Sequence, residues 1–148
     1  DDVSLEIVGE GPEEGALKAL AHDLGAPVRF SGWVSDVGAC FARSHLLILP
    51  SRWEGFGLVA VEAMASSRPV LGSAVDGLDE VLGDVGIRVD DGGEGVLRAS
   101  IASALERPED LERRAILGPD HAARWSIIRT VEAYEALYAE LAAKSLEA

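Results

Sequence analysis

The clearest pattern of hydrophobic positions in the chain is a short apolar run, a loop with two glycines, and a longer apolar run. Residues 46–49 are wholly apolar and end at Pro50, which is typical of a strand buried on both faces. Residues 58–65 are rich in Ala, and they predict a helix. The glycines between the two runs let backbone N–H groups approach a ligand at the N-terminus of this helix.

The same two kinds of pattern alternate along the rest of the chain. Further strands are predicted at residues 3–8, 28–34, 69–74 and 86–89, which makes five in all. Helices are predicted at residues 12–24, 36–41, 79–82 and 97–105, from 108 onward, and at 127–141, where the apolar stripe indicates core packing. This alternation predicts one α/β domain over residues 1–148, a Rossmann-like parallel sheet flanked by helices.

Two short motifs are weaker. Gly9 and Gly11 follow the first strand and could form a phosphate loop, but a tight strand-to-helix turn is the commoner origin of such a pair. Asp90 and Asp91 follow the last strand. Because no third ligand stands at a suitable spacing, a loop and helix cap is preferred to a metal site.

Glu62 is the one polar side chain in residues 58–65, so this helix is expected to pack into the body of the domain. A buried carboxylate needs donors, because an unpaired buried charge is costly or shifts its pKa. Two alternatives are open. Glu62 faces solvent or bonds nearby backbone N–H groups, or its partners are hydroxyl groups of a ligand.

Composition narrows the class of protein. With 148 residues and 48% hydrophobic content the chain suits a soluble α/β domain, and no apolar run approaches membrane-spanning length. The single Cys40 argues against a disulfide framework and favours a cytoplasmic location. A formal net charge of -13 argues against nucleic acid as a partner, because that binding needs clustered Lys and Arg. Any anionic ligand therefore needs locally aimed N–H groups.

Residues 50–65 resemble the signature of the retaining glycosyltransferases of family 4, in which two glutamates are separated by seven residues. Here these are Glu54 and Glu62. Further matches follow in the family's order at residues 7–12, 28–34, 68–71, 76–81 and 125–126, with Tyr134 and Tyr138. The resemblance covers nearly the whole chain. It implies the C-terminal, donor-binding domain of the GT-B architecture.

The resemblance also implies a site. Its donor-binding residues would be Trp33, Val34, Glu54, Gly55, Phe56, Gly57, Leu58, Val59 and Glu62. Glu54, the expected catalytic residue, would take hydroxyls of the donor sugar, Glu62 those of the ribose, and the N–H groups of residues 56–59 the diphosphate. Trp33 and Val34 would wall the base, although Trp33 is equally well explained as a partly buried aromatic at a strand end. The substrate would be a UDP- or GDP-linked sugar, with neither metal nor other cofactor.

Three features depart from the family. Its first strand, central in the sheet and followed by an Arg and Lys loop for the diphosphate, is missing here, as is the N-terminal acceptor domain. The missing strand is expected to come from another copy or segment, or else the sheet closes by a rearranged pairing, because unpaired buried backbone is rarely tolerated. Ser66 and Ser67 replace the usual glycine-containing helix end.

The favoured function is therefore the donor half of a retaining hexosyltransferase, inactive as this chain alone, with an unidentified acceptor. A non-catalytic nucleotide-binding or interaction module with the same fold is the alternative. A nucleotide-sugar epimerase is disfavoured by the two-glutamate signature.

Overall fold

The computed structural model describes residues 3–90 and 92–146. The chain divides into two compact units, Asp1–Val37 (unit 1) and Gly38–Ala148 (unit 2), and each is described here by itself. That both belong to one domain over residues 1–148 stays a prediction.

Unit 1 is a strand–helix–strand motif. Its elements are β1 (Leu5–Val8), α1 (Glu14–Asp23) and β2 (Val28–Gly32), and the two strands pair in parallel. Gly9 follows β1 with a φ of 115°, and its N–H donates to the Gly32 carbonyl at 2.7 Å. The tight turn predicted for the first glycine pair is thus present, because this backbone conformation favours glycine.

Unit 1 has little core. None of its described residues is buried, and Leu20 of α1 is 54% exposed. The contacts that hold the motif are partly polar: the Lys18 ammonium lies 5.6 Å from the centre of the Phe30 ring, and Arg29 pairs with Glu6 at 3.0 Å. The apolar face of α1 therefore remains largely exposed within this unit, since two strands offer too little surface to cover it.

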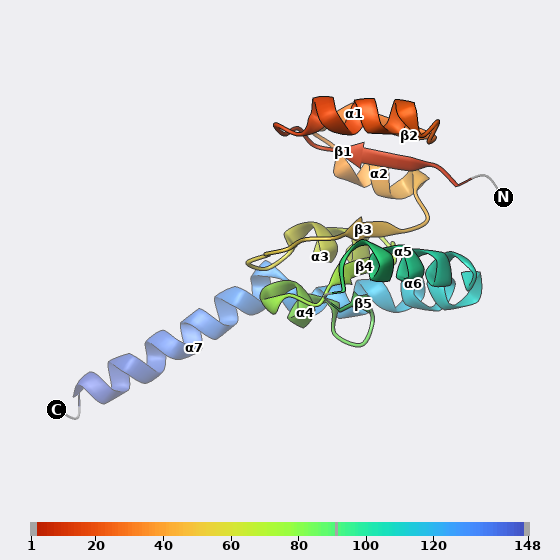
Figure 1. Cartoon of the computed structure of the whole chain (residues 1–148). Coiled ribbons are helices and arrows are strands. Elements are labelled where there is room, and N and C mark those ends of the chain that lie inside the picture. The colour runs from red at the N-terminus through yellow and green to blue at the C-terminus, as the bar shows by residue number, and fades with distance from the viewer. Residues whose placement is uncertain (1–2, 91, 147–148) are drawn as a thin grey trace. The chain divides into compact units, whose positions relative to one another are not determined.

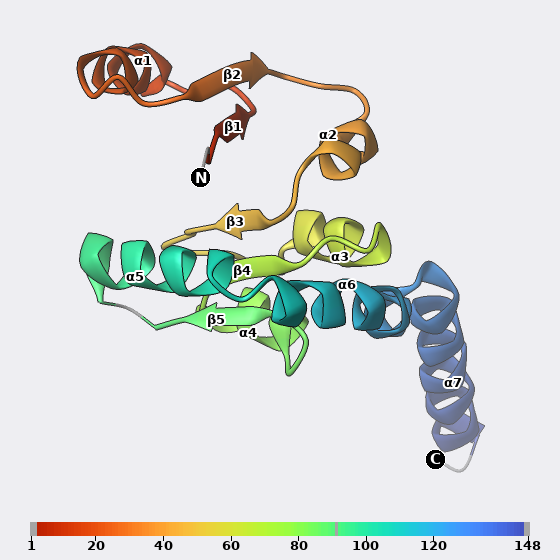
Figure 2. The ribbon, with the colours of Figure 1, turned by 90° about the vertical axis from the view of Figure 1, so that its right-hand side faces the viewer.

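Unit 2 contains the other described elements: α2 (Val37–Arg43, which begins at the boundary), β3 (Leu47–Leu49), α3 (Leu58–Ala65), β4 (Val70–Ser73), α4 (Asp76–Leu82), β5 (Ile87–Val89), α5 (Gly93–Leu105), α6 (Pro108–Ala122), the 3-10 turn η1 (Ala123–Trp125) and α7 (Ile127–Leu146). The strands form a parallel sheet in the order β3-β4-β5. Figure 1 shows the elements in chain order, and Figure 2 shows α5 and α6 running along one face of this sheet.

The core of unit 2 lies on both faces of its sheet. On one face Leu71, Val89 and Ala104 form a cluster that joins β4 and β5 to α5. Met64, Val70, Leu78, Val81 and Leu82 are also fully buried. Helices α3 and α6 pack closely, because a Cβ added at Gly118 would lie 2.6 Å from the Met64 carbonyl oxygen. Such two-sided cover is what a parallel sheet requires.

The burial predicted for β3 and for α7 is wrong. β3 is half-buried rather than buried on both faces, because among the described strands it pairs with β4 alone. The stripe on α7 is exposed rather than packed in a core: Ile127, Val131, Tyr134, Tyr138 and Leu141. This helix contacts η1 at its start, and Figure 1 shows it as one long continuous helix.

Five strands are present among the described residues, as predicted, and they do not form one sheet. β1 pairs with β2, β3 pairs with β4, and no pairing joins the two groups in residues 3–90 and 92–146. The alternative of a sheet closed by rearranged pairing is therefore wrong. In the described part of the chain β1 and β3 each keep one edge without a ladder partner, and completion of the sheet by a strand from another copy or segment stays a prediction.

Candidate functional site

The loop between β3 and α3 has the form that the sequence predicts. Glu54 is half-buried in it, and the buried Gly57 caps α3 with a left-handed φ of 88°. A Cβ at Gly57 would lie 2.9 Å from the Leu78 Cδ1 atom, so both the backbone angle and the space favour glycine here. The chain can therefore turn sharply from the end of a strand into a helix.

The first turn of α3 presents free donors. The N–H groups of Ala60 and Val61 bond the Gly57 carbonyl at 2.9 and 3.4 Å. In the part of the chain that the structure describes, the N–H groups of residues 56–59 donate no hydrogen bond. Unsatisfied N–H groups at a helix N-terminus attract anions, because the helix dipole adds to their partial positive charge.

Glu62 lies on the exposed side of α3. The buried positions Ala60, Ala63 and Met64 share one face, whereas Leu58 is 67% exposed and Glu62 is exposed one turn further on. The expectation that this helix packs all round is wrong, because one face alone packs on the sheet and α6. In the structure Glu62 faces solvent, about 6 Å along the axis from Leu58. That ligand hydroxyls are its partners stays a prediction.

Trp33 and Val34 lie at the end of unit 1, and the loop of residues 54–57 belongs to unit 2. The Trp33 side chain is 73% exposed, so its interpretation as a partly buried aromatic is wrong. Its backbone N–H donates to Glu10 Oε1 at 3.3 Å, which fixes the chain where β2 ends. A role for either residue in holding a base stays a prediction.

Sequence reasoning missed three residues that contact the loop. A Cβ at Gly77 would overlap the Gly55 carbonyl oxygen, and Leu78 faces Gly57. The Trp125 ring meets the Phe56 ring edge-on, with 5.2 Å between centroids and 81° between planes. The sequence shows residues 76–81 and 125–126 only as further matches to the family, and such matches do not indicate contact with a distant loop.

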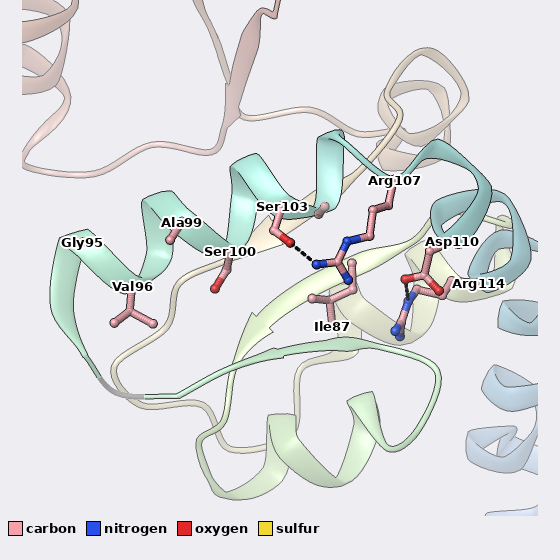
Figure 3. A pocket seen from close by; sticks show the side chains of 10 residues that line it. Ile87, Gly95, Val96, Ala99, Ser100, Ser103, Arg107, Asp110 and Arg114 are labelled. Carbon is pink, nitrogen blue, oxygen red and sulfur yellow. Dashed lines mark hydrogen bonds and ion pairs between the residues drawn. The ribbon is translucent and has the colours of Figure 1, made fainter.

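A cavity of unit 2 lies elsewhere, between α5, the start of α6 and β5 (Figure 3). Arg107 donates to the Ser103 hydroxyl at 2.7 Å, and Asp110 is paired with Arg114 at 2.7 Å and with Arg113. These hydrogen bonds, that from Arg114 foremost, lower the pKa of Asp110. No predicted donor-binding residue lines this cavity. Its charges hold α6 to the turn before β5, because Arg114 also donates to the Val85 and Gly86 carbonyls.

Residues 3–90 and 92–146 contain neither a grouped set of metal ligands nor a helix that could span a membrane. No three His, Cys, Asp or Glu side chains there are grouped to hold a metal ion. Asp91, one of the adjacent aspartates, lies outside the described residues, so the loop and cap predicted for the pair stay a prediction. Every described helix is too short or too polar to cross a bilayer.

Comparison with known proteins gives consistent matches. Residues 1–107 match the family model described as glycosyl transferases group 1. The chain is 36% identical to the phosphatidyl-myo-inositol mannosyltransferase of Mycobacterium leprae, covering 86% of this chain and 36% of that protein.

Solved structures match in fold. Sucrose-phosphate synthase from Thermosynechococcus elongatus has a TM-score of 0.77 at 26% identity, over 93% of this chain and 39% of the other. Anabaena Alr3699/HepE, solved with UDP-glucose, has a TM-score of 0.79 at 24% identity, over 93% and 40%. The chain thus spans about a third of the length of its curated relatives, 36% and 32% of the first two.

Proposed function

The chain belongs to the group 1 glycosyltransferases, and from this premise we propose that it is the nucleotide-sugar-binding part of a retaining hexosyltransferase. Its parallel sheets flanked by helices match the C-terminal domains of GT-B enzymes. In the reaction proposed for the parent protein, the bond from the sugar's anomeric carbon to the diphosphate breaks. A bond to an acceptor oxygen forms, with net retention of configuration and loss of the acceptor's proton.

The observation that carries this proposal is the loop of residues 54–57 leading into α3. Four backbone N–H groups without protein partners stand at the start of a helix, where the leaving diphosphate gains negative charge. Glu54 precedes them and Glu62 follows one helical turn after Leu58, on the exposed side. The N–H groups of residues 56–59 thus lie between two carboxylates. This arrangement suits a ligand that has a diphosphate between two groups of hydroxyls.

By family resemblance Glu54 takes hydroxyls of the donor sugar, Glu62 takes the ribose, and Trp33 and Val34 contact the base. Alr3699/HepE, solved with UDP-glucose, supports UDP as the nucleotide. Catalysis would need neither a metal nor another cofactor, because N–H groups and basic side chains stabilise the leaving group. The cytoplasmic location favoured by Cys40 stays a prediction.

We further propose that the open edges of β1 and β3 receive a strand from another segment of the parent protein. In the family that strand leads into the Arg and Lys loop for the diphosphate. Each charge-assisted hydrogen bond is worth about 1.5 to 3 kcal/mol. The chain alone is therefore expected to bind a nucleotide sugar weakly and to transfer no sugar.

Calorimetric titration of the chain with UDP, GDP and their glucose and mannose conjugates tests the site. Glu62→Ala should weaken binding of the nucleotide and its sugar about tenfold, the loss of one charge-assisted bond. Glu112→Ala, an exposed acid on α6, makes the same change in net charge and should alter neither affinity. Absence of any binding at millimolar nucleotide, or equal losses in both variants, would contradict the assignment.

Turnover separates the enzyme from the non-catalytic alternative. The chain replaces the matching segment of the Mycobacterium leprae relative, and release of nucleotide from its sugar conjugate is measured. Turnover that Glu54→Gln abolishes would support the enzyme. A folded fusion that binds nucleotide sugar but never releases nucleotide would favour the binding module.

A further inference from the structure

We infer that Gly77 is a positioning residue for Glu54: without a side chain, it lets the first turn of α4 seat the loop of residues 54–57. The role of Glu54 rests on the proposed function. The contact of the first turn of α4 with the loop, called the seat below, is a property of the fold and can be tested separately.

The contact at Gly77 is between backbones. A Cβ there would overlap the Gly55 carbonyl oxygen and lie 2.6 Å from the Gly55 carbonyl carbon and 2.9 Å from the Phe56 nitrogen. Backbone atoms cannot rotate away as the end of a flexible side chain does. Any side chain at Gly77 therefore displaces the loop or α4, and Glu54 is bonded directly to Gly55.

A second contact lies one residue further along α4. The fully buried Leu78 side chain faces Gly57, where a Cβ would lie 2.9 Å from its Cδ1 atom. Two successive residues of α4 thus meet two alternate glycines of the loop. Between those glycines Phe56 contacts the Trp125 ring. The loop therefore contacts α4 at residues 55 to 57 and is touched by an aromatic ring from η1.

Helix α4 is the less movable of the two partners. The Asp79 carboxylate forms an ion pair with the Arg88 guanidinium of β5. The Arg88 Nε atom lies 2.7 Å from Oδ1 and Nη2 lies 2.8 Å from Oδ2, which ties the first turn of α4 to the sheet. Leu78, Val81 and Leu82 are all fully buried beneath it. The loop, by contrast, has Gly55 exposed, with open space where a Cβ would be. An added methyl group at Gly77 should therefore shift the loop.

Amide NMR spectra of the chain test the seat directly. Gly77→Ala should move the ¹H–¹⁵N resonances of residues 54–57. Gly118→Ala is the matched control, because its Cβ also meets backbone, the Met64 carbonyl oxygen at 2.6 Å, but at the other end of α3. It should lower the melting temperature and leave those four resonances in place. Unchanged resonances of residues 54–57 in Gly77→Ala would overturn the inference.

The functional readout is the ratio of the Kd for UDP to the Kd for UDP-glucose, titrated in the same spectra. A lower folded population weakens both ligands equally and leaves the ratio unchanged. A displaced Glu54 should reduce it about tenfold, the loss of one charge-assisted hydrogen bond. If the wild-type chain binds both ligands equally, the role proposed for Glu54 fails, while the amide shifts still decide the seat. Moved amides with an unchanged ratio would overturn the positioning role.

If Gly77→Ala fails to fold, the wild-type chain still provides a test of the contact. The close approach predicts a nuclear Overhauser effect between the Gly77 α protons and the Phe56 amide proton. Its presence supports the seat, and its absence in an otherwise assigned spectrum overturns it.

Discussion

Units 1 and 2 are built from the same parts, parallel strands joined by helices, but they bury very different shares of their apolar side chains. In unit 2, Leu71 and Leu78 are 0% exposed, whereas in unit 1 no described residue is buried and Leu24 is 71% exposed. The difference arises because helices pack on both faces of the β3-β4-β5 sheet. The parallel pair β1-β2 has one helix, which can cover one face only. The apolar pattern of unit 1 therefore indicates surface that needs further cover.

The largest predicted effect compares one substitution in the two units. Leu71→Ala should lower the free energy of unfolding by about 2 to 5 kcal/mol, because it leaves a cavity in the core. Leu20→Ala, on the exposed face of α1, should change it by less than about 0.5 kcal/mol. Urea denaturation followed by circular dichroism measures both. Similar losses would mean that α1 is covered in solution.

The next comparison predicts that Gly→Ala substitutions in the two units change the free energy of unfolding in opposite directions. Gly118→Ala should cost about 1 to 3 kcal/mol, because its methyl group meets the Met64 carbonyl where α3 and α6 pack. Gly15→Ala in α1 meets nothing within 4 Å and should stabilise by up to about 1 kcal/mol through helix propensity. Melting temperatures give both signs. Destabilisation by Gly15→Ala would show that this face of α1 is in close contact in solution.

These differences mark what the sequence could predict of the fold. The five strands, the short helix α4 and the glycine turns follow from local patterns that each segment carries itself. The burial of side chains could not be predicted from these patterns. The apolar stripes of α1 and α7 have the spacing typical of packed helices, yet Leu20 and Tyr138 are exposed. Periodicity shows that a face is apolar, but it does not show what covers that face.

The site divides in the same way. The loop and its left-handed Gly57 were predictable, because a glycine pair between an apolar strand and an apolar helix is a local signal. The exposure of Glu62 was not, since it depends on which side of α3 packs on α6. Contacts from Gly77 and Trp125 arise from tertiary packing, which a single sequence does not encode in any short motif.

The ion pairs extend the comparison to pH. Asp110 bonds Arg114, whose guanidinium is largely buried and also bound to two carbonyls, so Asp110→Asn should cost about 1 kcal/mol at pH 7. The pair of Glu14 and Lys18 in unit 1 is the control, because Lys18 is exposed where Arg114 is not, and Glu14→Gln should cost less than about 0.5 kcal/mol.

The pH dependence of the Asp110 effect follows from its lowered pKa. The unfolded chain takes up a proton near the ordinary value of about 3.9, at higher pH than the folded chain does. The stability from the carboxylate is therefore fully present above that value and is lost as pH falls through the lowered folded value. Urea midpoints from pH 7 to 2 should show wild type and Asp110→Asn converging below pH 4. A constant difference would contradict this role.

The smallest effect concerns two helix ends with the same pattern of capping hydrogen bonds and different residues at the left-handed position. After α1, the Gly25 and Ala26 N–H groups bond the His22 and Ala21 carbonyls; after α3, those of Ser67 and Arg68 bond Met64 and Ala63 in the same pattern. The left-handed position is Gly25 in unit 1, with φ of 58°, and Ser67 in unit 2, with φ of 53°.

A side chain at a left-handed position crowds the following carbonyl, and glycine avoids this strain. Ser67→Gly should therefore stabilise unit 2 by about 0.5 to 1 kcal/mol, after some loss to the greater freedom of glycine in the unfolded chain. Gly25→Ser should destabilise unit 1 by a similar amount, so the two melting shifts should be opposite in sign. If Ser67→Gly lowers the melting temperature instead, the serine side chain contributes a contact that outweighs its backbone strain.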